Sequence, residues 1–229
     1  MAVTVQSVVD RVQAVIQDTT GVRWPEAELI YWVNDAQREI VLFKPDANAV
    51  NGTVTLVTGT KQSIPADGIR LLRVVRNMSA ASGGDGGRSV RIVEREILDA
   101  QTPSWHDPAS KGDAAHGGVV KHFVYDEQDP RNFYVYPGVA SASTVYLEIV
   151  YSGNPTAVTI SDNISLPDVF ANAIMDYVLY RAYSKDAEFA SNAQRATTHY
   201  QLFLQSVGGK SAADNTSTPN IVRVAQRQS

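Results

Sequence analysis

Apolar residues recur at helical spacing in the N-terminal part of the chain. One set is Val5, Val8, Val9, Val12, Val15 and Ile16, and a second is Leu29, Trp32, Val33, Ala36, Ile40 and Phe43. Each set forms one face of an amphipathic helix. Thr4 is a suitable N-cap for the first helix, and Pro25 opens the second, which Pro45 ends. The short link around Gly21 makes the two helices an antiparallel pair.

A second helical pair is predicted toward the C-terminus. Pro167 and Asp168 mark the first turn of a helix. Its buried face is Phe170, Ala173, Ile174, Tyr177 and Val178. The next helix carries one apolar seam, made of Phe189, Ala193, Ala196, Tyr200, Phe203 and Val207. Gly208 and Gly209 are expected to end it.

Between the two pairs the apolar residues alternate with a period of two, which is typical of β-strands. Residues 52–65 (GTVTLVTGTKQSIP) predict a hairpin that turns at Thr58–Lys61, and residues 121–137 predict another that turns at EQDPR. IRLLRVVRNM and RSVRIV are further strand segments, and VEREILDAQ is a short helix. The last strand, STVYLEIVYS, places Val145, Leu147, Ile149 and Tyr151 on one face.

These patterns predict an α+β fold. The helix pairs of residues 1–47 and 165–208 are expected to form one helical bundle. A small antiparallel β-domain, residues 48–164, is expected to be inserted into it. Residues 209–229 are expected to form an extended C-terminal arm.

Composition narrows the range of functions. Of the 229 residues, 44% are hydrophobic and 19% are charged, as in an ordinary globular protein. The chain has no cysteine, which excludes disulfides and thiolate metal sites. A formal charge of −4 argues against tight nucleic-acid binding, and no apolar run is long enough to span a membrane.

Segments that resemble functional motifs lack the residues that the chemistry needs. The loop SGGDGGRS has Arg88 where a P-loop has lysine, and a strand follows it instead of a helix. The acidic turn at residues 126–129 lacks the glycine and the spacing of a calcium loop. The four histidines, outside any HxxxH or HExxH pattern, are His106, His116, His122 and His199. We therefore expect no catalytic residue, no metal and no cofactor.

Two regions are candidates for contact with other proteins. Tyr180 and Tyr183 lie off the predicted buried face of their helix, next to Arg181, and tyrosine and arginine are enriched at subunit interfaces. The C-terminal segment has two arginines and no acid after Asp214. Its apolar run IVRV is suited to adding a strand to a partner's sheet.

Both ends of the chain resemble a known family. VIQDTTGVRWPEAELIYWVNDAQREIVLFKPDA resembles the N-terminal signature of tailed-phage head-to-tail adaptor (connector) proteins. YVLYRAYSKDAEFASNAQRATTHYQLF is similar to the C-terminal helical pair of the same group, of the tail tubular protein A type found in short-tailed phages. The resemblance covers nearly the whole chain up to about Gly209 and rests on structural segments, not catalytic ones.

The resemblance implies a structural virion protein of the neck and tail, synthesised in the host cytoplasm, and not an enzyme. It implies a homo-oligomeric ring, of twelve copies, that lies beneath the portal protein, extends the DNA channel used in DNA ejection and provides the attachment platform for tail or nozzle proteins. Genomic DNA would pass through without sequence-specific binding, and no membrane would be involved. Applied here, Tyr180, Arg181 and Tyr183 become candidates for subunit contact. The portal-contact arm becomes Ile221, Val222, Arg223 and Val224.

Two alternatives stay open at this point. The first keeps the virion but makes the chain a tail-terminator or neck protein in another position. The second is a small hydrolase or carbohydrate-active module that uses the loop of Trp105, His106 and Asp107, although the chain has no GxSxG nucleophile elbow.

Overall fold

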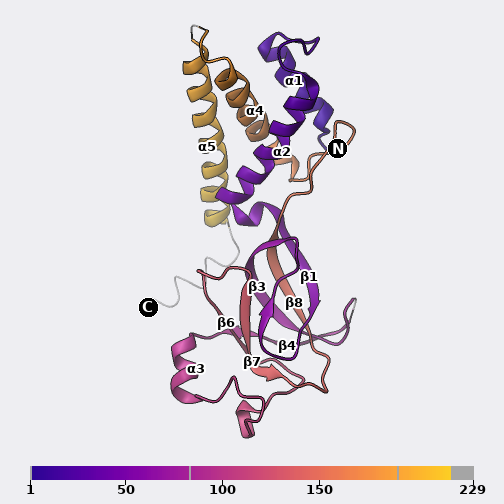
Figure 1. Cartoon of the computed structure of the whole chain (residues 1–229), viewed down its shortest axis with the longest axis vertical. Coiled ribbons are helices and arrows are strands. Elements are labelled where there is room, and N and C mark those ends of the chain that lie inside the picture. The colour runs from indigo at the N-terminus through magenta and orange to yellow at the C-terminus, as the bar shows by residue number, and fades with distance from the viewer. Residues whose placement is uncertain (1, 83, 190, 218–229) are drawn as a thin grey trace. The chain divides into compact units, whose positions relative to one another are not determined.

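The computed structural model describes residues 2–82, 84–189 and 191–217, with side chains in the last helix described as far as Gly209. The chain divides into two compact units, which are coloured along the sequence in Figure 1. The helical unit comprises residues 1–47 and 155–229, and the β unit comprises residues 48–154.

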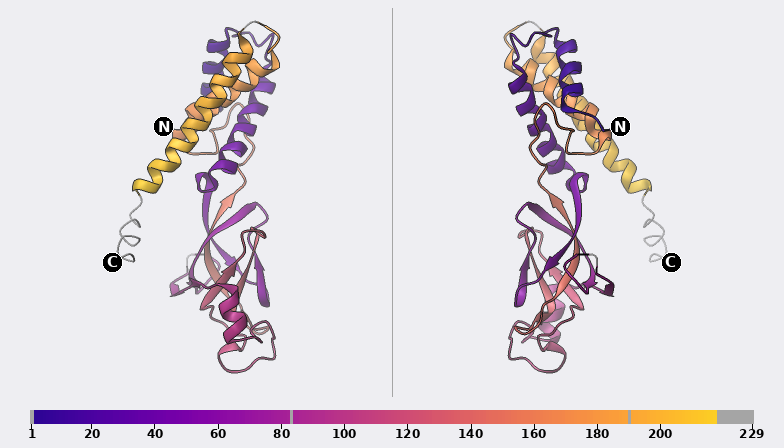
Figure 2. Two further views of the ribbon diagram at one scale, coloured as in Figure 1. Left: turned by 90° about the vertical axis from the view of Figure 1, so that its left-hand side faces the viewer. Right: turned by 90° about the vertical axis from the view of Figure 1, so that its right-hand side faces the viewer.

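Four α-helices build the described part of the helical unit: α1 (Val5–Ile16), α2 (Glu26–Phe43), α4 (Ala171–Lys185) and α5 (Asn192–Ser217). There are also two 3-10 turns: η1 (Pro45–Asn48) follows α2, and η3 (Asp168–Phe170) directly precedes α4. One continuous apolar core joins the four helices, and α4 packs against α1, α2 and α5. The two views of Figure 2 show α5 running alongside α4 and beyond its end.

The predicted helix faces are largely correct. Thr4 caps α1, because its Oγ1 accepts a hydrogen bond from the Ser7 N–H at 3.1 Å. Val5, Val8, Val9 and Val12 are buried, as are Phe170, Ala173, Ile174, Tyr177 and Val178. Val15 and Phe43 are exceptions, since each has about half of its surface exposed. The predicted seam of the last helix is wrong at its start, because Phe189 and Ala193 are exposed and Phe189 precedes α5.

Asp18 organises the link between α1 and α2. Its carboxylate accepts three backbone hydrogen bonds, from Val22 at 3.0 Å, Arg23 at 2.8 Å and Trp24 at 2.9 Å. The buried Trp24 then donates its indole N–H to the Ala182 carbonyl at 3.2 Å, which ties the link to α4. The Asp18 carboxylate therefore fixes the link, and Trp24 connects the link to α4.

The predicted end of the last helix at Gly208 and Gly209 is wrong, because α5 runs on to Ser217. A Cβ atom placed on either glycine would have no other atom within 4 Å, and neither glycine has a positive φ. A glycine inside a helix costs only about 1 kcal/mol relative to alanine, so the helix continues through both.

The described residues of the β unit form two four-stranded sheets. The first has the order β1-β8-β3-β4 and the second the order β2-β7-β6-β5. The strands are β1 (Ala49–Thr55), β2 (Gly59–Ser63), β3 (Gly68–Met78), β4 (Gly86–Ser89), β5 (Arg91–Ile92), β6 (His122–Tyr125), β7 (Asn132–Val139) and β8 (Tyr146–Gly153). A short helix, α3 (Arg95–Gln101), and a 3-10 turn, η2 (Gly112–Ala114), lie in the long connection between β5 and β6.

The second sheet separates two apolar cores. The larger core lies between the sheets and takes Phe133 and Val135 from β7 and Leu147 and Ile149 from β8. The smaller core lies on the other side of β7, where Tyr134 and Tyr136 meet Trp105 and the Leu98 side chain of α3. The period-two alternation of β7 thus supplies both cores.

The predicted fold class, a helical bundle with a small inserted β-domain, is wrong. The described residues form a mixed α/β structure with five α-helices and two sheets of four strands each. The β part is not small, because it has two cores and a helix of its own. The sequence pattern underestimated it because its pairings are distant in the chain; for example, Ala49 pairs with Ser152.

The predicted hairpin in residues 52–65 is also wrong. β1 pairs with β8 in the first sheet, whereas β2 pairs with β7 in the second. The hairpin of β6 and β7 is confirmed, as are the short helix α3 and the buried face of β8. Local alternation identified the strands, but it gave the right partner only for the hairpin of β6 and β7.

β3 has an unusual period of three. Its buried residues are Gly68, Leu71, Val74 and Asn77. Opposite β8 the register shifts after Gly68, Leu71 and Val74, which inserts one extra residue into β3 each time. The residues that follow the insertions, which we call the arginine ladder, are Arg70, Arg73 and Arg76, opposite Ser152, Val150 and Glu148. Val150 and Glu148 alternate with buried residues of β8, so Arg73 and Arg76 lie on the outer face of the first sheet. Arg70 is only partly exposed, and Ser152 opposite it is buried.

The Asp18 carboxylate gives a pH-dependent prediction. Hydrogen bonds from backbone N–H groups, above all that of Trp24, lower the pKa of Asp18 below its ordinary value of 3.8. A lowered pKa contributes stability that is present above the ordinary value and is lost as the pH falls through the folded-state value. We expect Asp18→Asn to lower the urea midpoint of unfolding at pH 7, and the gap to wild type to narrow below about pH 4.

The control is Asp10→Asn, since Asp10 accepts one exposed hydrogen bond from the Gln6 side chain. This variant should unfold at the wild-type urea concentration at both pH values. An equal loss for Asp18→Asn at pH 7 and pH 3 would contradict the assigned role.

Candidate functional site

The loop that suggested a hydrolase does not assemble a catalytic triad. The Nδ1 atom of His106 lies 2.8 Å from the Thr60 hydroxyl, and its ring stacks on the fully buried Trp105. Burial, followed by the nearby Arg95, lowers the pKa of His106 below its ordinary value. The Asp107 carboxylate accepts the Ala109 N–H instead of contacting His106. These residues hold the loop against the second sheet.

The other motif-like segments serve local structure. Gly86–Ser89 forms strand β4, so no helix N-terminus faces the glycine-rich loop. Asp126 caps its own turn by accepting the Gln128 N–H at 2.9 Å. Within the described ranges, no three histidine, aspartate or glutamate side chains come close enough together to hold a metal ion.

The helical unit instead offers surfaces for contact, beginning with α2. Asn34 and Gln37 of α2 are buried and receive the chain where it returns from the β unit. The Asn34 amide donates to the Val158 carbonyl at 3.0 Å and accepts the Val158 N–H at 2.8 Å. Gln37 Oε1 accepts hydrogen bonds from the backbone N–H and hydroxyl of Ser165, at 2.6 Å and 2.8 Å. Residues 157–166 are therefore fixed beside α2.

A groove of about 400 Å³ lies between α2 and this fixed segment. Its lining residues are Ala27, Ile30, Tyr31, Asn34, Asp35, Arg38, Ala157, Val158 and Thr159. Tyr31 and Leu42 are 71% and 73% exposed, and they are eleven residues apart, which places them on one side of the helix. We call the exposed side formed by Ala27, Tyr31, Asp35, Arg38 and Leu42 the α2 surface.

A cluster of aromatic rings joins α4, α5 and the end of α2. Tyr180 packs on Tyr200 with ring centroids 4.8 Å apart, and Tyr177 packs on Phe203 at 5.2 Å. Phe43 meets Phe203 edge to face at 6.3 Å. Tyr177 and Phe203 are buried, whereas the rings that keep exposed surface are Phe43, Tyr180 and Tyr200. We call these three the aromatic patch.

The three predicted subunit-contact residues differ in exposure. Tyr180 belongs to the aromatic patch, and Arg181 beside it is partly exposed. Tyr183 is only 6% exposed and stacks on His199, whose Nδ1 lies 3.0 Å from an Asp176 carboxylate oxygen. Their role in subunit contact stays a prediction. The predicted arm residues, Ile221, Val222, Arg223 and Val224, lie outside the described residues.

Sequence reasoning missed the α2 surface. Tyr31, Arg38 and Leu42 recur opposite the buried face of α2, and this spacing was visible in the sequence. This spacing did not indicate an interface, because the solvent face of any amphipathic helix has the same spacing. The groove itself depends on residues 157–159, which no local pattern brings to α2.

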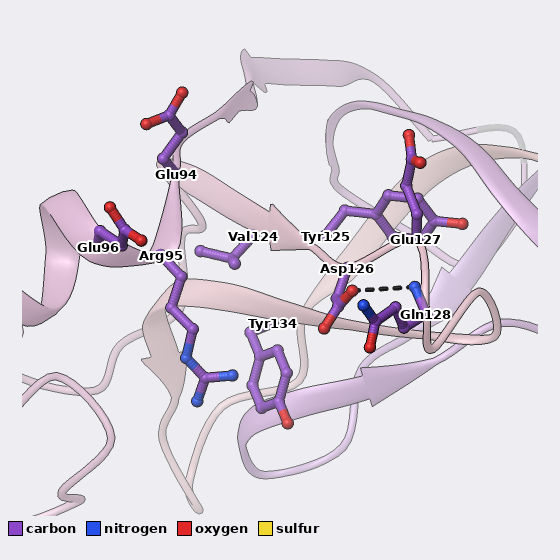
Figure 3. Close-up of a pocket in the computed structure, with 9 residues that line it drawn as sticks. All are labelled: Glu94, Arg95, Glu96, Val124, Tyr125, Asp126, Glu127, Gln128 and Tyr134. Atoms are coloured by element: carbon purple, nitrogen blue, oxygen red, sulfur yellow. Dashed lines mark hydrogen bonds between the residues drawn. The ribbon is translucent and has the colours of Figure 1, made fainter.

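The β unit has a second groove, of about 510 Å³, shown in Figure 3. It lies between the start of α3 and the turn that joins β6 to β7. We call it the acidic groove after its four carboxylates, Glu94, Glu96, Asp126 and Glu127. Arg95 is the one cation in its lining, and it lies over the Tyr134 ring, 5.0 Å from the centroid, and 3.6 Å from an Asp99 carboxylate oxygen.

Comparison with known proteins identifies the family. The family model of the SU10 adaptor protein matches residues 3–223, which is nearly the whole chain. Among curated proteins, none matches the chain. Within the described part of the molecule, no helix is both long and apolar enough to cross a lipid bilayer. The resemblance to phage head-to-tail adaptors is confirmed, and the chain belongs to the SU10 adaptor protein family of structural virion proteins.

Proposed function

We propose that this adaptor assembles as a ring of twelve copies beneath the portal protein, where it extends the DNA channel and provides the platform for tail or nozzle proteins. The family supports the adaptor role. The observation that supports the ring is the presence of two separate surfaces with exposed apolar side chains, the α2 surface and the aromatic patch, on one helical unit. The α2 surface also holds the ion pair of Asp35 and Arg38.

A closed ring repeats one heterologous interface, so each copy needs two different patches that fit each other. Leu42 belongs to the α2 surface and Phe43 to the aromatic patch, and consecutive residues point about 100° apart around a helix. The two regions therefore face different directions. Such an arrangement favours chains of contacts over a self-paired dimer.

In the proposed ring, the aromatic patch of one copy packs on the α2 surface of the next. The groove beside Tyr31 gives a large side chain a pocket to fill, and buried tyrosines are frequent anchors of interfaces. Tyr180 would make the contact, with Arg181 at its edge. Tyr183 would act from inside by holding α5 in place through its stacking on His199.

The C-terminal arm is proposed to bind the portal. Ile221, Val222 and Val224 are apolar and Arg223 is basic, a composition suited to pairing with an exposed strand edge. Genomic DNA is proposed to pass the ring without sequence-specific contacts. A subunit with a formal charge of −4 does not attract the phosphate backbone strongly, which suits a channel that DNA must slide through.

The alternative position, that of a tail terminator or another neck protein, keeps the same ring but changes its neighbour. Mixing the adaptor with the portal of the same phage separates the two proposals. Co-migration in size-exclusion chromatography supports the position beneath the portal, and its absence favours the alternative.

Leu42→Glu tests the ring. Because the Leu42 side chain is largely exposed, the variant should fold normally by circular dichroism. A carboxylate buried at the centre of the interface should cost at least ~2 kcal/mol, or about 30-fold in association between neighbours. Sedimentation velocity over a range of concentrations measures this loss.

Val169→Glu is the matched control, since Val169 is an exposed apolar residue of the helical unit outside both surfaces. It should assemble like wild type. A Leu42→Glu chain that forms rings at wild-type concentration would show that the α2 surface is not the interface.

Removal of residues 218–229 tests the arm. The shortened chain keeps every described helix and should still fold and form rings, but it should no longer co-migrate with the portal. A control chain that lacks only residues 225–229 retains Ile221–Val224 and should bind. Unchanged portal affinity of the shorter chain would refute the arm proposal and leave the ring untouched.

A further inference from the structure

Two surfaces of opposite charge lie on opposite sides of the β unit. The arginine ladder is on the outer face of the first sheet, and the acidic groove is on the outer side of the second. Positive and negative charges are also separated along the sequence. Residues 68–93 hold five arginines and one acid, a net charge of +4, and residues 94–131 hold four basic residues and eight acids, a net charge of −4.

The arginine ladder is available for a partner mainly at Arg73, because Arg76 has a carboxylate partner and the Nε of Arg70 is buried. Arg76 contacts Glu148, with its Nε 3.1 Å from a carboxylate oxygen. Among the described residues, no carboxylate forms an ion pair with Arg70 or Arg73, and Arg73 is exposed. Ile69 and Leu72, the residues inserted beside the first two arginines, also keep about two fifths of their surface exposed. The outer face of β3 therefore combines the positive charge of the arginine ladder with exposed apolar side chains.

The acidic groove has the complementary character. Figure 3 shows Glu94 and Glu96 on the side of α3, with Asp126 and Glu127 at the turn across from them. Arg95 is already engaged with the Tyr134 ring and Asp99, which leaves the negative charge of the groove in excess. Its apolar lining comes from Val124, Tyr125 and Tyr134.

We propose that the acidic groove of one copy receives the arginine ladder of the next copy. This inference rests on the proposed ring and gives it a second contact, between β units. A homomeric ring presents every groove to a neighbour's ladder, so opposite charges on opposite sides of one unit are what a repeated head-to-tail contact needs.

Ile69 and Leu72, the exposed apolar residues beside the arginine ladder, favour a protein partner over nucleic acid. A phosphate backbone is recognised by charge and hydrogen bonds, and it offers no apolar surface for Ile69 and Leu72. The tyrosines of the groove offer such a surface. Because both surfaces are partly exposed, the contact should weaken as salt is raised.

Two charge reversals test the pairing. Arg73→Glu makes the ladder more negative, and Glu127→Arg makes the groove more positive. Each variant alone then brings like charges together at every contact, and we expect ring assembly to weaken ~10-fold or more in sedimentation velocity. An equimolar mixture of the two variants allows alternating rings in which every contact joins opposite charges, and assembly should return to within about threefold of wild type.

Two exposed charges serve as controls. Lys61→Glu and Asp113→Arg reverse charges in the same unit but outside the two surfaces. Both variants should assemble like wild type, and mixing them should change nothing. Circular dichroism and thermal unfolding should show that the two charge-reversal variants and the two controls all fold like wild type.

Each outcome decides a separate question. If wild type forms rings and neither reversal weakens them, or if mixing fails to restore assembly, the pairing of β units is wrong and the ring stands. If wild type stays monomeric both alone and with portal, the ring fails and this inference fails with it. If Arg73→Glu keeps its rings but loses affinity for duplex DNA, the ladder is a nucleic-acid surface and the proposal is overturned.

Discussion

The helical unit depends on two amide side chains buried in α2. The chain leaves this unit at Ala47 and re-enters it at Pro155, and Asn34 and Gln37 are the residues that receive it. Without them, the N–H groups of Val158 and Ser165 would lose their partners, a cost of about 1–3 kcal/mol for each buried group. With them, η3 and the start of α4 are set in place. Since α4 packs against the other three helices, the whole unit inherits its geometry from these contacts.

The tyrosine-rich stretch of α4 and α5 acquires a physical explanation from the same arrangement. Tyr177 and Phe203 fill the space between the helices, and Tyr180 and Tyr200 extend the aromatic cluster to the surface. Aromatic rings supply large contact areas at low cost in conformational entropy, and their edges remain usable by a second molecule. One set of side chains therefore holds α5 in its unit and also gives that unit an exposed apolar surface.

Sequence reasoning succeeded where the determining interactions were local. The buried faces of α1 and α4 followed from a 3.6-residue period, and the cap at Thr4 followed from one hydroxyl. The resemblance to phage adaptors was based on the same helical segments of the sequence. Strand partners were predicted this way only for β6 and β7, which a short turn joins; β1 and β2 are neighbours in sequence but pair in different sheets.

The candidate surfaces were predictable only in part. Tyr180 was identified because it lies off the buried face of α4, but Tyr183 is buried by the stacking of His199, which belongs to another helix. The groove of the α2 surface needs the returning segment at Val158, and the acidic groove needs α3 and a distant turn. In each case the missing information was a contact between segments far apart in the chain.

The three bulges of β3 make the triplet the structural unit of this strand. Each triplet holds one inserted apolar residue, one arginine and one core residue, while β8 advances by two residues. Deletion of an inserted residue, Ile69, Leu72 or Val75, would remove one bulge and leave the remaining side chains opposite the same β8 residues. A deletion or duplication of three residues would preserve the facing of every side chain. The spacing of the arginines along the outer face is therefore set by the bulges, while the alternation of β8 sets which residues of β3 reach the core.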